Sequence, residues 1–215
     1  MRLSSSVLVA SVLCVASSAK ADIVYEVTVD TFSISGTMGS LDFNFNLGPL
    51  VTQPASLQIL DFISDGTLAA CAGNVQGFCP TGDVTGTLPG TLTFDNGTVF
   101  NDYFDGFTYG NSLSFDVRLY GPSINSPNGT ATSGSTFVFS VFSDVGGTIP
   151  VLTTDTADGF AATIDVNLDG STTVTDFSKQ TAIAPAASAV PEPNTVVPLG
   201  TITALGMLRL RRRKT

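Results

Sequence analysis

The 215-residue chain has no histidine, no tryptophan and only three cysteines. The absence of histidine removes the commonest general base and the commonest metal ligand of proteins. Basic residues are also scarce outside the two ends: between residues 22 and 188, sixteen aspartates and one glutamate stand against Arg118 and Lys179. Such an acidic body repels nucleic-acid phosphates and anionic lipid, so we exclude nucleic-acid binding.

The first 21 residues have the three parts of a secretory signal. Arg2 gives a positive start, residues 7–16 are apolar, and Ala19-Lys20-Ala21 is a small-x-small cleavage site. The apolar run is too short for a membrane anchor. We therefore expect export by the Sec machinery, with Asp22 as the first residue of the mature chain.

A second apolar segment, residues 195–208, precedes a basic tail. As a helix it would be about 21 Å long, whereas the hydrocarbon core of a membrane is about 30 Å thick. Pro198, Gly200 and Gly206 weaken it further. The basic tail favours the cytoplasmic side and leaves the acidic body outside. A segment this marginal is suited to holding a protein briefly at the membrane.

The C-terminal 26 residues resemble the PEP-CTERM sorting signal of Gram-negative bacteria. The resemblance is carried by Val190, Pro191, Glu192 and Pro193, by the apolar run, and by a basic cluster that includes Arg209, Arg211, Arg212 and Arg213. It implies recognition by an exosortase, a membrane-embedded cysteine protease, and cleavage near the Pro-Glu-Pro motif. The protein would then be released toward the cell surface or an extracellular polysaccharide matrix. Residues 179–189, rich in Ala, Pro and Ser, are expected to form an extended linker.

The body is similar to a group of small PEP-CTERM proteins as well. The shared stretches are Val29-Asp30-Thr31, residues 39–43 (GSLDF) and residues 134–137 (GSTF). That group has no established activity, so this resemblance implies none.

Residues 22–178 show a period of two. Apolar and polar residues alternate over residues 23–29, 41–47, 113–119 and 136–142, which places the apolar set on one face of a strand. Turn signals such as Asp65-Gly66 recur about every ten residues. The pattern predicts an all-β fold, an antiparallel β-sandwich of which the jelly roll is one form, with phenylalanines filling the core.

Cys71 and Cys79 enclose seven residues. In an exported chain the simplest interpretation is a disulfide. A zinc site is the alternative, but two thiolates without histidine or further cysteines cannot complete its four ligands.

Residues 165–176 have the spacing of a calcium-binding loop, with oxygen ligands at alternate positions, a glycine at position 6 and a carboxylate at position 12. The candidate ligands are Asp165, Asn167, Asp169, Ser171 and Asp176. The flanks do not favour helices, as such loops require. The alternative is a β-hairpin that turns at Asp169-Gly170.

Four aromatic residues lie around one turn, in the segment NDYFDGFTYG at residues 101–110. β-Sandwiches commonly bind sugars through exposed aromatic rings, which makes Tyr103 and Tyr109 candidate glycan-binding residues. The alternative is that these rings face the core of a hairpin.

Catalysis has little support in the sequence. Aspartate pairs such as Asp102/Asp105 and Asp155/Asp158 could supply an acid and a base. With sixteen aspartates in the body, however, close pairs arise by chance. We expect a surface or matrix protein that is not an enzyme and needs no cofactor, with exosortase and extracellular polysaccharide as its partners. The alternative is a module that binds carbohydrate or calcium.

Overall fold

The computed structural model describes residues 21–69 and 80–186. Over these ranges the chain forms twelve β-strands, a short α-helix and one 3₁₀ turn. In chain order they are β1 (Ile23–Asp30), η1 (Phe32–Ile34), β2 (Met38–Leu47), β3 (Ser56–Ser64), β4 (Thr67–Leu68), β5 (Val84–Thr85), β6 (Leu92–Asp95), β7 (Asp102–Thr108), β8 (Ser112–Tyr120), α1 (Pro122–Asn125), β9 (Ser135–Phe142), β10 (Phe160–Val166), β11 (Thr172–Asp176) and β12 (Thr181–Pro185).

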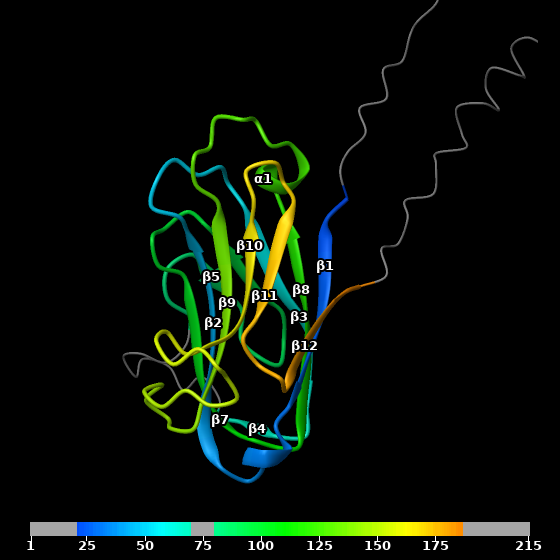
Figure 1. Ribbon diagram of the computed structural model, residues 1–215, viewed down its shortest axis with the longest axis vertical. Coiled ribbons are helices and arrows are strands. Elements are labelled where there is room, and N and C mark those ends of the chain that lie inside the picture. Colours follow the sequence, from blue (N-terminus) through cyan, green and yellow to red (C-terminus); the bar gives the residue numbers. More distant parts are fainter. Residues whose placement is uncertain (1–20, 70–79, 187–215) are drawn as a thin grey trace, which may run out of the picture.

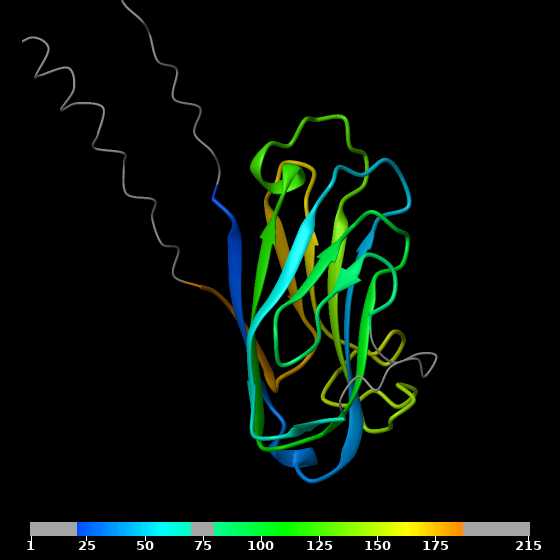
Figure 2. The same ribbon diagram turned by 180° about the vertical axis from the view of Figure 1, so that it is seen from behind.

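The strands form two six-stranded antiparallel sheets that pack face to face (Figures 1 and 2). Sheet A has the order β12-β1-β8-β3-β6-β5, and sheet B has the order β11-β10-β9-β2-β7-β4. The predicted β-sandwich is therefore confirmed. The order β1-β8-β3-β6 facing β2-β7-β4 is the wrapping of a jelly roll. Strands β9 to β11 extend sheet B beyond β2, and β12 extends sheet A beyond β1.

The alternating sequence of β2 shows how the layers form. Leu41, Phe43 and Phe45 point into the sandwich and are fully buried, while the residues between them face outward. The Phe43 ring lies 5.2 Å from the ring of Phe115 in sheet A and 5.1 Å from that of Phe139 in sheet B, measured between centroids. Edge-on and tilted aromatic pairs of this kind add stability beyond the area that they bury. Phenylalanine is the commonest residue among the buried hydrophobic side chains of the described chain.

The first and last strands of the sandwich, β1 and β12, pair with each other at one edge of sheet A (Figure 1). The backbone N–H of Ala186 donates to the carbonyl of Val24 at 2.8 Å. Strand β12 falls inside the predicted linker of residues 179–189, so the prediction that the sandwich ends at Ser178 is wrong. Thr181 is buried and Ile183 packs against the core. The alternation is too short to identify as a strand from sequence.

The first residues of the sandwich are also tied to its body. The Asp22 carboxylate accepts from Arg118 Nη2 at 2.5 Å and from Arg118 Nε at 2.8 Å. Its other oxygen accepts from Asn125 at 3.4 Å. Asp22 therefore belongs to the fold.

Residues 143–159, which we call the covering segment, fold back over part of the outer face of sheet B (Figure 1). The Ser40 hydroxyl of β2 donates to the carbonyl of Asp144 at 2.9 Å. Gly147 lies against the ring of Phe104, so close that a Cβ there would be 2.6 Å from a ring carbon. Part of the outer face of sheet B is thus removed from water.

Candidate functional sites

Most residues of the predicted processing signals and the predicted disulfide lie outside the described ranges. They are Ala19, Cys71, Cys79, Val190, Pro191, Glu192, Pro193, Arg209, Arg211, Arg212 and Arg213. Within the described ranges no helix has the length and apolar character needed to cross a membrane.

The two candidate glycan-binding tyrosines are buried in the core. Tyr103 has 0% of its surface exposed and Tyr109 has 2%. The prediction that their rings offer a sugar-stacking surface is wrong, because a ring stacks on a sugar only from an exposed face. The core-facing arrangement, which was the alternative, is the one observed. Strand β7 directs Tyr103 inward because its register partner is the inward-facing Phe43.

Each tyrosine hydroxyl has polar partners inside the core. The Tyr103 hydroxyl accepts from the backbone N–H of Leu88 at 3.0 Å and donates to the Asp105 carboxylate at 3.2 Å. Burial raises the pKa of Tyr103 to about 12, and burial also raises the pKa of Asp105. The Tyr109 hydroxyl lies 2.6 Å from the carbonyl oxygen of Ser40 and 2.9 Å from that of Phe142. Both tyrosines are structural.

The calcium-loop segment is a β-hairpin, the alternative weighed above. Strand β10 pairs with β11, and the chain turns at residues 167–171. Asp176 lies opposite Ala162, at the end of the ladder away from the turn. Asp165 accepts from the Thr136 hydroxyl at 2.6 Å, and Asp169 accepts from the backbone and hydroxyl of Ser171. The predicted ligand set therefore does not converge, because a strand separates side chains that a helical flank would bring together.

The remaining member of that set, Asn167, stabilises the same turn. Its side-chain amide donates to the hydroxyls of Ser171 and Thr173, each at 3.0 Å. In the part of the chain that the structure describes, no three carboxyl or thiol side chains gather closely enough to hold a metal ion.

The aspartate pairs considered for catalysis do not form acid–base pairs. Asp102 and Asp105 point to opposite faces of β7, since their register partners are the outward Asn44 and the inward Leu41. Asp155 accepts hydrogen bonds from the backbone N–H groups of Ala157, Asp158 and Phe160, at 3.1 to 3.2 Å. That carboxylate shapes the covering segment, and these hydrogen bonds lower its pKa.

A different pair, Asp42 of β2 and Asp102 of β7, meets on the outer face of sheet B. The pKa of Asp42 is raised well above its usual value, chiefly by burial, then by a hydrogen bond to Asp102 and by the charge of Asp102. Burial raises the pKa of Asp102 as well. The side-chain amide of Asn44 donates to Asp42 at 2.7 Å. Sequence reasoning missed this pair, because the partners are sixty positions apart.

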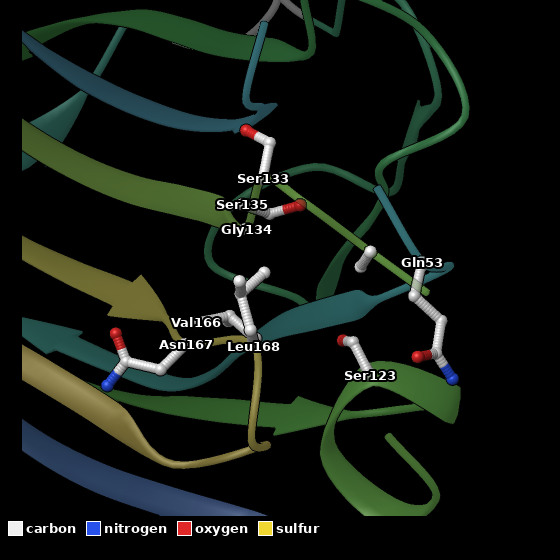
Figure 3. Close-up of a pocket in the computed structure, with 9 residues that line it drawn as sticks. Gln53, Ser123, Ser133, Gly134, Ser135, Val166, Asn167 and Leu168 are labelled. Carbon is white, nitrogen blue, oxygen red and sulfur yellow. The ribbon is translucent and has the colours of Figure 1, made fainter. Parts of the chain in front are cut away.

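A polar groove of about 370 Å³ lies at the end of the sandwich where the β10–β11 hairpin turns. It is lined by Gly48, Pro49, residues 132–136 and residues 165–168, so Asp165 and Asn167 face it. Beside it is a smaller pocket between Gln53, Ser123 and Leu168 (Figure 3). Its cavity volume of about 10 Å³ is room for about one water molecule. The Ser123 hydroxyl is buried there without a partner in the described chain.

Comparisons with protein-family models, curated proteins and solved structures give no match. The candidate sites above are therefore interpreted from their own residues and geometry.

Proposed function

We propose that this chain is an exported, non-catalytic protein of the cell surface or extracellular matrix, sorted by an exosortase through its C-terminal signal. In this proposal the β-sandwich is the passenger, and the segments on either side direct its delivery. Processing removes residues 1–21 and separates the sandwich from the apolar segment near Glu192.

The observation that carries the proposal is that the first and last strands of the sandwich pair with each other. Val24 and Ala186 are joined by a backbone hydrogen bond, so the N-terminal and C-terminal segments leave the fold next to each other. Strand β1 has eight residues, which corresponds to about 26 Å of sandwich length. Ends separated by that length would place one of the two segments far from the membrane. Adjacent ends let both segments reach the same membrane.

The distance from the fold to the motif is short. Four peptide steps join Ala186 to Val190, and an extended chain covers at most about 3.6 Å per residue. The motif therefore lies within about 15 Å of the last residue of the sandwich. An exosortase that cleaves there must work beside the β1–β12 edge, and the acidic surface of the domain keeps the passenger in water.

The proposal is tested by replacing Pro191, Glu192 and Pro193 together with alanine. We expect the variant to accumulate in the membrane fraction with its C-terminal segment attached, while the wild type is recovered from the cell surface or the medium. Immunoblots of fractions, with antibodies to the sandwich, measure both. The matched control is Pro185→Ala, a proline just outside the motif, which should be processed normally. Release of the triple variant at the wild-type rate would refute sorting by this motif.

A second candidate function is carbohydrate binding, favoured by the groove that Asp165 and Asn167 line. Its volume of about 370 Å³ falls in the range of small-molecule sites. The test is retention of the protein on extracellular polysaccharide. Carbohydrate binding is supported if Asn167→Ala abolishes retention and Tyr103→Phe, a change at a buried residue, preserves it. Equal retention of both variants would count against the groove.

A further inference from the structure

The tripeptide Asn-Gly-Thr occurs twice in the chain, at residues 96–98 and 128–130, and these are its two Asn-Gly pairs. An asparagine before glycine is chemically vulnerable, because the backbone nitrogen of the next residue can attack the carbon of the side-chain amide. Glycine has no Cβ to hinder that attack. The two sites share this local chemistry, so a difference in their reactivity must come from the fold.

The first asparagine, Asn96, is held in the interior and is 7% exposed. Its Oδ1 accepts from the backbone N–H of Ala55 at 2.9 Å. Its Nδ2 donates to the carbonyl of Gln53 at 3.0 Å and to the Ser135 hydroxyl at 2.8 Å. These hydrogen bonds must break before the amide carbon can turn toward the next backbone nitrogen, and breaking them in a buried site costs free energy.

The surroundings of the two glycines also differ. Gly97 lies against a carboxylate, since a Cβ there would collide with Asp83 Oδ2. A negative charge so close opposes the loss of a proton from the Gly97 nitrogen. Gly129 has a φ of +69°, and a Cβ there would meet no atom within 4 Å. The second Asn-Gly pair therefore has open space around it.

Asn128 lies in the loop that follows α1 at one end of the sandwich (Figure 1), and it and the next two residues are exposed. Its Oδ1 accepts from the backbone N–H of Thr130 at 2.9 Å and from the Thr130 hydroxyl at 2.7 Å. Two donors on this oxygen draw electron density from Cγ and stabilise the negative charge that develops on the oxygen during attack. The corresponding hydroxyl of the first tripeptide, that of Thr98, bonds instead with Asn101 and with the carbonyl of Phe100.

Two other asparagines of the described ranges, Asn111 and Asn125, precede serine, which is also small. The backbone N–H groups of those two serines are already engaged. One donates to the Asp65 carboxylate at 3.0 Å, and the other donates to the carbonyl of Pro122 at 2.9 Å. Those hydrogen bonds must be given up before either nitrogen can attack.

We propose that Asn128 is a site of spontaneous deamidation in the folded protein. The Gly129 nitrogen loses its proton to hydroxide and forms a bond to Cγ of Asn128. The bond from Cγ to Nδ2 breaks, and that nitrogen takes a proton and leaves as ammonia. Water then opens the cyclic imide at either of its carbonyls, which gives aspartate or isoaspartate. The net reaction consumes one water and releases one ammonia, and nothing is oxidised or reduced.

The product changes a loop that is anchored on both sides of Asn128. Upstream, the Gln53 side chain accepts from the backbone N–H of Asn128 at 3.0 Å. Downstream, the N–H of Thr132 donates to the carbonyl of Val51 at 2.8 Å. Isoaspartate puts one more carbon atom into the main chain between these anchors, and either product adds a negative charge. Residues 132–136 line the polar groove, so deamidation alters the rim of that groove.

The test is incubation of the full chain in mildly alkaline buffer, followed by digestion and mass spectrometry of the peptides that contain the two sites. We expect Asn128 to convert at least about tenfold faster than Asn96, because Asn96 reacts only from locally opened chains, which are a small fraction of the population. In urea the two asparagines should convert at rates equal within about twofold, since the fold no longer distinguishes them. The reaction needs no processing of the chain, so this test is independent of the sorting proposal.

Three variants assign the reaction. Asn128→Gln should keep an amide at this position but abolish the conversion, because cyclisation would then require a larger ring that forms more slowly. Thr130→Val removes the hydroxyl donor and should slow the conversion of Asn128 about fivefold, the effect of one hydrogen bond. The matched control is Thr98→Val, which removes the corresponding hydroxyl of the first tripeptide and should leave the rate at Asn128 unchanged.

Two results would overturn the proposal. The first is a folded chain in which Asn128 stays intact as long as Asn96 does while both convert in urea, which would show that the loop protects the site. The second is conversion of Asn96 ahead of Asn128 in the folded chain. An equal rate in Thr130→Val and the wild type would contradict the activation of Cγ by the threonine hydroxyl.

Discussion

The outer faces of the two sheets both carry neighbouring acidic side chains, but these side chains differ in their exposure to water. On sheet A, Glu26 of β1 lies directly opposite Asp116 of β8, and Asp61 adds its charge from a bulge in β3. On sheet B, Asp42 and Asp102 meet beside the covering segment. Like charges that face each other across a sheet are destabilising on either face.

Solvation separates the two faces. Glu26 and Asp61 are exposed to water, which screens their repulsion. On sheet B, the Asp102 oxygen and the neighbouring Asn44 oxygen are fully buried, and burial is the largest cause of the raised pKa of Asp42. Density of charge therefore does not by itself mark a site.

The largest expected effect on stability comes from truncating a side chain in the core that both sheets share. Phe43 lies between Asp42 and Asn44 on β2 and packs on both sheets. Phe43→Ala should lower the free energy of unfolding by about 3–5 kcal/mol, the usual cost of truncating a buried phenylalanine. Urea unfolding followed by circular dichroism measures the loss. The control is Phe32→Ala, because Phe32 is 72% exposed and should cost less than about 0.5 kcal/mol. An equal loss of unfolding free energy in both variants would contradict the packing of Phe43 between the two sheets.

A smaller effect should be confined to sheet B. The Tyr109 hydroxyl ties the carbonyls of Ser40 and Phe142 together where the covering segment begins. Tyr109→Phe leaves buried carbonyls without that donor and should cost about 1–3 kcal/mol. Amide hydrogen exchange should become faster in β9 and in residues 143–151 and stay unchanged in β1 and β8. Tyr120→Phe, which keeps the ring under Arg118, is the control and should change neither measurement. Faster exchange throughout sheet A would contradict the local role of Tyr109.

The smallest effect is a pH dependence that distinguishes the two faces. A carboxyl whose pKa is raised in the folded state binds its proton more tightly there than in the unfolded chain. The free energy of unfolding therefore falls as the pH rises from about 4, near the ordinary aspartate pKa of 3.8, through the folded-state pKa. In metal-free buffer we expect the chain to be more stable at pH 5 than at pH 7, as urea midpoints at the two pH values would show.

Two variants assign this pH dependence. Asp42→Asn should remove much of it and stabilise the chain at pH 7 by up to about 1 kcal/mol through the loss of like-charge repulsion. Asp116→Asn should keep most of it. Below pH 4 the sign reverses, since Asp65, Asp144 and Asp155 have lowered pKa values and their contribution is lost as they become protonated. A flat profile between pH 5 and 7 in the wild type would contradict the raised pKa of Asp42.

The fold was predictable because its signal is local. Alternation along β2, β8 and β9 identifies inward and outward residues without knowledge of partners, and the Asp169-Gly170 turn marks the hairpin. The same local reasoning left Tyr103 of β7, and Tyr109 directly after that strand, undecided, because the exposure of a ring depends on whether the other sheet covers its face. Strand β12 was missed because its alternation covers only five residues and ends in proline.

The pair on sheet B could not be found from sequence. Asp42 and Asn44 stand out only as polar residues on the outward side of an alternating strand. Asp102 meets them through strand pairing over sixty positions, and the covering segment comes from another part of the chain. Burial and missing donors appear only when these long-range contacts are formed.

We propose above all that the sandwich is a passenger released by cleavage on both sides. Intact-mass measurement of the native protein, recovered from cells and from the medium, tests that claim most directly. We predict a species that starts at Asp22 and ends near Glu192. A stable membrane-bound species that still carries Thr215 would contradict the claim.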